Sequence, residues 1–129
     1  MNNWITAAAV IVAGLATAAA PAVAQSGEAS KGQRVFNTQC RACHTLEKDG
    51  AQATGPNLHG LFGRKAGTSA GYAYSDAMKN SGIVWDETTL AEYNRDPKGK
   101  VPGTKMLYNG VKNAGQLADL VAYLKEATK

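Results

Sequence analysis

Charge is missing from the start of this chain of 129 residues. Residues 1–24, MNNWITAAAVIVAGLATAAAPAVA, contain no Asp, Glu, Lys or Arg, and their centre is almost wholly Ala, Val, Ile and Leu. They end in Ala22-Val23-Ala24, the small-x-small pattern that signal peptidases cut. We therefore predict an export signal that is cleaved before Gln25 and a mature protein in the periplasm. The alternative is an uncleaved membrane anchor, because the segment is just long enough to span a bilayer.

The remainder, residues 25–129, lacks strand patterns, internal repeats and low-complexity linkers, and its length suits one domain. All charged side chains lie in this part, which gives it the whole net charge of +4. A basic excess favours an acidic partner surface. Nucleic acid is not expected as a partner, because the chain is exported and has no basic run interleaved with aromatic residues.

Two long segments have helical patterns. The first runs from Glu28 to Cys40 and places Val35 and Phe36 on its inner side. The second lies near the C-terminus, where one apolar stripe recurs at i, i+3, i+4 and i+7. The stripe consists of Leu117, Leu120, Val121 and Leu124.

A third, shorter helix is predicted from Thr88 to Arg95, with Asp86 as its N-cap and Pro97 closing it. The stretch GAQATGPNLHGLFGRKAGTSAGYAYS is rich in Gly and turn-forming residues and excludes an array of strands. The expected fold class is therefore all-α. Three helices and long loops make a thin core, so a further component should fill the middle.

Both cysteines of the chain, Cys40 and Cys43, lie in CRACH, directly before His44. A redox dithiol would be expected after a strand in a βαβ unit, which the helical pattern does not supply. A closed zinc site needs four ligands, and beyond this motif only His59 is a plausible N or S donor. Covalent haem attachment fits best, because two thiols can add across the two vinyl groups and His44 can ligate the iron.

The second axial ligand must come from elsewhere in the chain. The candidates are His59, Met78 and Met106, since Met1 leaves with the leader. Position alone does not choose among them.

Five blocks of the sequence resemble class I cytochrome c, most closely the bacterial proteins similar to the mitochondrial form. The blocks are CRACHTLEKDG, TGPNLHGLFGRKAG, YSDAMKNSGIVWDETTLAEY, DPKGKVPGTKML and DLVAYLKEAT. They cover nearly all of residues 25–129 in the right order. The resemblance implies a single all-α cytochrome c domain in which the N- and C-terminal helices cross at Gly32, with a shorter helix and long loops around one covalent haem c.

The resemblance also implies the roles of individual residues. Cys40 and Cys43 would bind the porphyrin, His44 and Met106 would ligate the iron, and the Pro56 carbonyl would accept a hydrogen bond from His44. His59 would occupy a surface loop, and Tyr93 would lie beside the methionine ligand. Groups near the haem propionates would come from Arg64, Tyr74, Ser75, Trp85 and Thr104.

Some positions differ from what the mitochondrial proteins usually have. Met78 replaces an asparagine behind the haem, Tyr108 replaces a phenylalanine at the haem edge, and Gln39 and Gly99 replace lysines.

A haem iron with both axial positions filled has no open site for a substrate, so the resemblance implies an electron carrier and not an enzyme. We expect a soluble, monomeric carrier of single electrons from a cytochrome bc complex to a cytochrome c oxidase or a photosynthetic reaction centre. Its contact with membranes would be transient, through acidic docking surfaces of these complexes. The cations expected to rim the haem edge are Arg41, Lys98, Lys100, Lys105 and Lys112.

Overall fold

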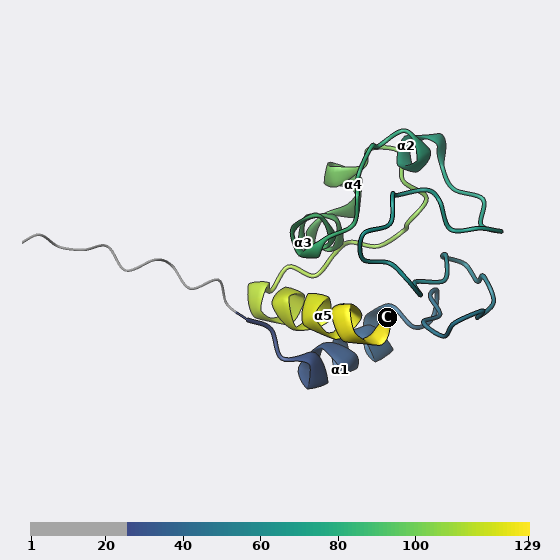
Figure 1. The fold of residues 1–129 in the computed structure, drawn as a ribbon. Helices are drawn as coiled ribbons and strands as arrows, with labels where there is room; N and C mark the ends of the chain where they lie inside the picture. Colours follow the sequence, from purple (N-terminus) through teal and green to yellow (C-terminus); the bar gives the residue numbers. More distant parts are fainter. Residues whose placement is uncertain (1–25) are drawn as a thin grey trace, which may run out of the picture.

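The structure, a computed structural model, describes residues 26–129, so the predicted export signal lies outside the described residues. The described residues form five helices, most of them joined by loops (Figure 1). They are α1 (Ala29–Gln39), α2 (Asp76–Lys79), α3 (Glu87–Arg95), α4 (Pro97–Lys100) and α5 (Ala114–Ala127). The described part contains no strand, only one isolated bridge between Lys65 and Val84, and the all-α prediction is confirmed. None of the helices in residues 26–129 is long and apolar enough to cross a membrane.

The two long helices, α1 and α5, cross and pack together as predicted (Figure 1). Gly32 lies at the crossing, where a Cβ atom would come 1.8 Å from the backbone oxygen of Asp119. The absence of a side chain therefore lets the two backbones approach. Phe36 packs against Tyr123 beside the crossing, with their ring centroids 5.7 Å apart.

Helix α3 begins where Asp86 predicts it. The Asp86 carboxylate accepts from the Thr89 backbone N–H, and the Thr89 hydroxyl oxygen accepts from the Asp86 backbone N–H. This reciprocal capping satisfies two backbone donors at the start of the helix. Pro97 does more than close α3, because it also stands at the first turn of the short helix α4. The short helix α2 was not predicted, although Ser75 caps it by accepting from the Met78 N–H.

The apolar interior forms two clusters. One joins α1 to α5 through residues such as Phe36, Leu120 and Leu124. The other gathers Trp85, Leu90, Tyr93 and their neighbours around α2 and α3. The space between the clusters is the candidate site.

Candidate functional site

A cavity of about 240 Å³ is lined by residues of both apolar clusters. Its wall is mostly apolar. All four predicted site residues, Cys40, Cys43, His44 and Met106, line it. The loop that follows α1 supplies the cysteines and the histidine, and the segment between α4 and α5 supplies the methionine. Folding thus brings together groups that are more than sixty positions apart in the sequence.

The His44 imidazole is held by the loop that faces it. Its Nδ1 lies 2.8 Å from the carbonyl oxygen of Pro56, which confirms the predicted contact. A carbonyl can only accept, so Nδ1 carries the hydrogen and the lone pair is on Nε2. Burial lowers the pKa of His44, which favours this neutral ring at pH 7. Gly55 lies against the ring, and a Cβ there would meet His44 Cε1 at 2.4 Å.

No disulfide joins the two cysteines, and Cys40 is buried and Cys43 partly buried. Burial, and to a lesser extent the neighbouring Cys43, raises the pKa of Cys40 to about 11. A redox dithiol requires the opposite shift, because the thiolate is the reactive form. Within residues 26–129, no group of three or more His, Cys, Asp and Glu side chains is placed to hold a metal ion. The buried position of Cys40 therefore disfavours an attacking thiolate, and the described residues assemble no ligand set for zinc.

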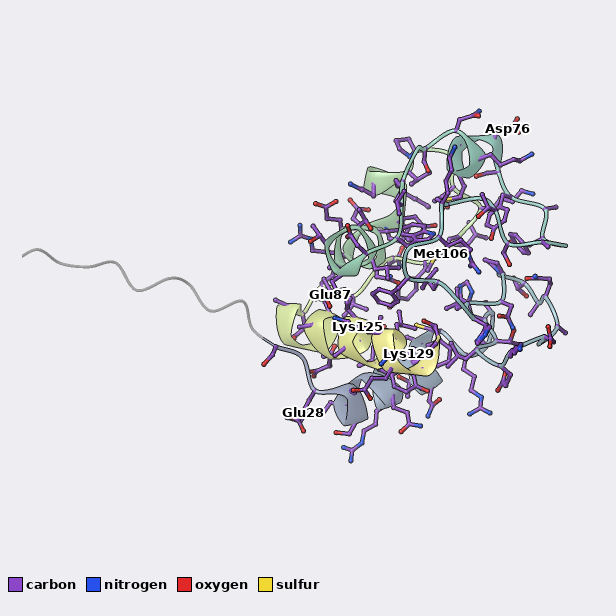
Figure 2. The ribbon with its side chains drawn as sticks, in the orientation of Figure 1. Glu28, Asp76, Glu87, Met106, Lys125 and Lys129 are labelled. Atoms are coloured by element: carbon purple, nitrogen blue, oxygen red, sulfur yellow. The ribbon has the colours of Figure 1, made fainter. Side chains whose placement is uncertain are left out.

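The three candidates for the second ligand separate into two groups. His59 is half-buried but does not line the cavity, whereas Met78 and Met106 both do. Met78, only 6% exposed, belongs to the cluster around Trp85 and Tyr93, and Met106 packs against that same cluster. Figure 2 shows Met106 toward the centre of the domain, away from labelled surface charges such as Glu28 and Asp76. Two thioethers thus face one cavity.

Hydrogen bonds fix the backbone that carries Met106. The hydroxyl groups of Tyr93 and Thr104 lie 2.7 Å apart and share a hydrogen bond. The Thr104 oxygen also accepts from the Met106 N–H at 3.3 Å. Tyr93 is itself held by Trp85, whose ring centroid lies 5.3 Å away. Tyr93 and Met106 line the same cavity, as the resemblance implied.

The five residues expected near the haem propionates all line the cavity: Arg64, Tyr74, Ser75, Trp85 and Thr104. Tyr72 was not predicted from the sequence, although it also lines the cavity and donates to the Thr54 carbonyl at 2.8 Å. The ring of Tyr72 packs edge-on against Tyr74, with centroids 4.8 Å apart. The i, i+2 spacing in GYAYS was the available signal, because alternate residues of an extended segment point to the same side.

The mouth of the cavity combines apolar and basic side chains. Leu107 and Lys105 both line it. Leu107 is 90% exposed, which is unusual for a large apolar side chain in this domain. Lys105 Nζ donates to the Ala73 carbonyl at 2.8 Å and makes no ion pair within the described residues.

The other expected rim cations differ in their surroundings. Lys112 donates to the Arg95 carbonyl at 2.7 Å, and neither Arg41 nor Lys98 is in an ion pair of the described part. Lys100 is different because it pairs with Glu92 of α3. Lys100 therefore contributes less free positive charge to the rim than the sequence suggested.

The donor set of this cavity fits a haem. It offers two neighbouring thiols for attachment, an imidazole with a free Nε2 lone pair, a thioether and a largely apolar wall. An imidazole and a thioether are the axial ligands typical of haem iron in electron carriers.

Comparisons with known proteins agree with the site. A family model described as Cytochrome c matches residues 29–128. Among curated proteins, cytochrome c of Gibberella zeae is 52% identical over 103 residues, covering 80% of this chain and 97% of that protein. Cytochrome c of Ginkgo biloba is 49% identical over 105 residues, covering 81% of this chain and 93% of that protein. Cytochrome c2 of Blastochloris viridis is 52% identical over 112 residues, covering 87% of this chain and 86% of that protein.

Proposed function

Because this chain belongs to the cytochrome c family, in which haem c is bound covalently and electrons are carried, we propose that it moves single electrons through a haem ligated by His44 and Met106. We propose further that Cys40 and Cys43 hold this haem. The observation that carries the proposal is the cavity that gathers all four side chains between the two apolar clusters.

The bound haem supplies an iron that alternates between the ferrous and ferric states. The chain's own residues prepare the site for it. Pro56 keeps the Nδ1 proton of His44, so Nε2 is the nitrogen available as a ligand, and the bond to a carbonyl raises the ligand's basicity. The apolar wall excludes water and disfavours additional positive charge, which favours the ferrous state.

Met106 is the better of the two thioethers for the second ligand. Its backbone N–H is held by Thr104, which is held in turn by Tyr93, so the segment has a defined position at the cavity. Met78 is the buried residue of the short helix α2 and packs into the cluster of Trp85 and Tyr93, and filling that core accounts for it. A neutral thioether ligand also favours ferrous iron and a high potential.

The proposed partners are a cytochrome bc complex as donor and a cytochrome c oxidase or reaction centre as acceptor. Support comes from the mouth of the cavity, where an exposed apolar side chain, Leu107, adjoins an unpaired cation, Lys105. A small apolar contact ringed by charge suits encounters that must be quick and reversible. We place the mature protein, from Gln25 onward, in the periplasm as a monomer.

A visible spectrum of the holoprotein tests the ligand set. We expect a low-spin c-type spectrum with a weak methionine–iron charge-transfer band in the ferric state. Met106→Ala should remove that band, open the iron to added ligands and lower the potential. Met78→Leu, which conserves volume, is the matched control and should keep the band. Loss of the band in Met78→Leu and its survival in Met106→Ala would overturn the assignment.

Covalent attachment has its own test. Intact mass of the holoprotein should include one haem, and acidified solvent should not extract it, because two thioether bonds hold it. Recovery of apoprotein mass alone would contradict the roles proposed for Cys40 and Cys43.

A further inference from the structure

The segment between Met106 and α5 is weakly attached to the rest of the domain. Thr104 and Lys105 are tied down before it, by Tyr93 and by the Ala73 carbonyl. After it, the Val111 N–H donates to the Asn94 carbonyl at 2.8 Å. Residues 107–110 in between make no backbone hydrogen bond in the described part of the chain. The proposed iron ligand, Met106, is therefore followed by four residues whose backbone makes no hydrogen bond to the rest of the described domain.

One side-chain contact bridges this stretch. The Tyr108 hydroxyl donates to Gln39 Oε1, and within residues 26–129 no other hydrogen bond joins 107–110 to another segment. Gln39 is the last residue of α1 and directly precedes Cys40. The contact thus joins the segment of the proposed thiol attachment to the segment of the proposed methionine ligand. Both Tyr108 and Gln39 line the cavity.

The surroundings of the two side chains favour a lasting contact. The ring of Tyr108 is partly buried and packs against the cluster that contains Val35, Cys40 and Val111. The ring is thus anchored, and its hydroxyl reaches toward the end of α1. Gln39 is exposed, but it extends from a helix whose inner face is buried against α5. The bond forms between two supported elements and costs less ordering than one between free side chains.

We propose that the Tyr108–Gln39 hydrogen bond is a latch that holds the Met106 segment closed over the cavity, so that Tyr108 and Gln39 are positioning residues for the methionine ligand. The inference rests on the proposed function, because it takes Met106 as that ligand. Loss of the latch should leave the resting fold intact and make departure of Met106 from the iron more frequent.

Imidazole binding to the ferric holoprotein measures that departure. At saturating imidazole and fixed neutral pH, the binding rate should level off at the rate at which the Met106 segment opens. A partly exposed intramolecular hydrogen bond contributes in the lower part of its usual range, which corresponds to about a 2- to 5-fold change. We expect Tyr108→Phe and Gln39→Leu each to raise the plateau rate by that factor. The charge-transfer band should still be present in both variants before imidazole is added.

Three further variants make the test specific to the latch. The double variant Tyr108→Phe/Gln39→Leu should open no faster than either single variant, because one bond can be lost only once. Gln39→Glu keeps an acceptor oxygen at the same reach and should stay near the wild-type rate. Tyr123→Phe is the matched control, because it removes the hydroxyl of a tyrosine that packs against the same apolar cluster as Tyr108 but does not line the cavity. It should leave the plateau unchanged.

Failure of the latch and failure of the proposed function give different results. Met106→Ala should bind imidazole without a plateau, and if it keeps the wild-type plateau, the ligand assignment is wrong. If Met106→Ala behaves as expected but the single latch variants open at the wild-type rate, the latch is wrong and the ligand assignment stands. Additive effects in the double variant would also overturn the latch, because they would show that the two side chains act separately.

Discussion

Replacing Gly32 by alanine tests the crossing of α1 and α5 that closes the fold. The added Cβ would lie 1.8 Å from the Asp119 backbone oxygen and 2.7 Å from Tyr123 Cβ. Backbone atoms cannot rotate away as a flexible side chain can, so the helices must separate by roughly 1.5 Å to restore normal contact. That separation also loosens the packing of Phe36 against Tyr123. Overpacking of this kind costs about 1–3 kcal/mol, and we expect the upper end of that range.

The assay is denaturant unfolding of the holoprotein, which gives the free energy of unfolding of each variant. Gly115→Ala is the matched control in the first turn of α5. There a Cβ would meet only the Asn113 side-chain oxygen, at 3.2 Å, so alanine should be neutral or more stable by up to about 1 kcal/mol. If Gly32→Ala unfolds within about 0.5 kcal/mol of wild type, the close helix crossing does not have the importance that we assign to it.

Three other predictions concern docking, pH and export. Lys105→Glu should slow reduction by a purified bc complex and flatten the dependence of that rate on ionic strength, because exposed charges are screened over about 8 Å at physiological salt; a wild-type rate independent of salt would exclude electrostatic docking. The Thr89 backbone N–H lowers the pKa of Asp86 from its ordinary value of 3.8, so its contribution to stability is full above that value and is lost as the pH falls through the lower folded-state pKa. Asp86→Asn keeps the cap without the titration, so its unfolding free energy should fall less in acid than that of wild type; equal losses would show that Asp86 is not involved. N-terminal sequencing of protein from the periplasm should begin at Gln25, and a chain that keeps Met1 would indicate a retained anchor.

The sequence by itself determined the features that depend on near neighbours. The CRACH motif places Cys40, Cys43 and His44 within five consecutive residues, so their joint role in haem attachment can be predicted without knowing the fold. The stripe from Leu117 to Leu124 is spaced for one helix face, and all four of its residues are buried in α5. Asp86 predicts the start of α3 because an N-cap side chain accepts a hydrogen bond from a backbone N–H only two or three positions later.

Short elements were beyond the reach of periodicity. Helices α2 and α4 have four residues each, too few for a repeat of 3.6 to show. Pro97 therefore indicated only the end of α3, although a proline also suits the first turn of the next helix.

Only the tertiary structure decided which distant side chains meet. It placed Met78 and Met106 at one cavity and kept His59 out of its wall, whereas position in the sequence left all three open. It joined Tyr108 to Gln39, which are 69 positions apart. Such contacts depend on the path of long loops between the helices. That path is determined by how the two apolar clusters pack around the cavity, and no local pattern of residues encodes it.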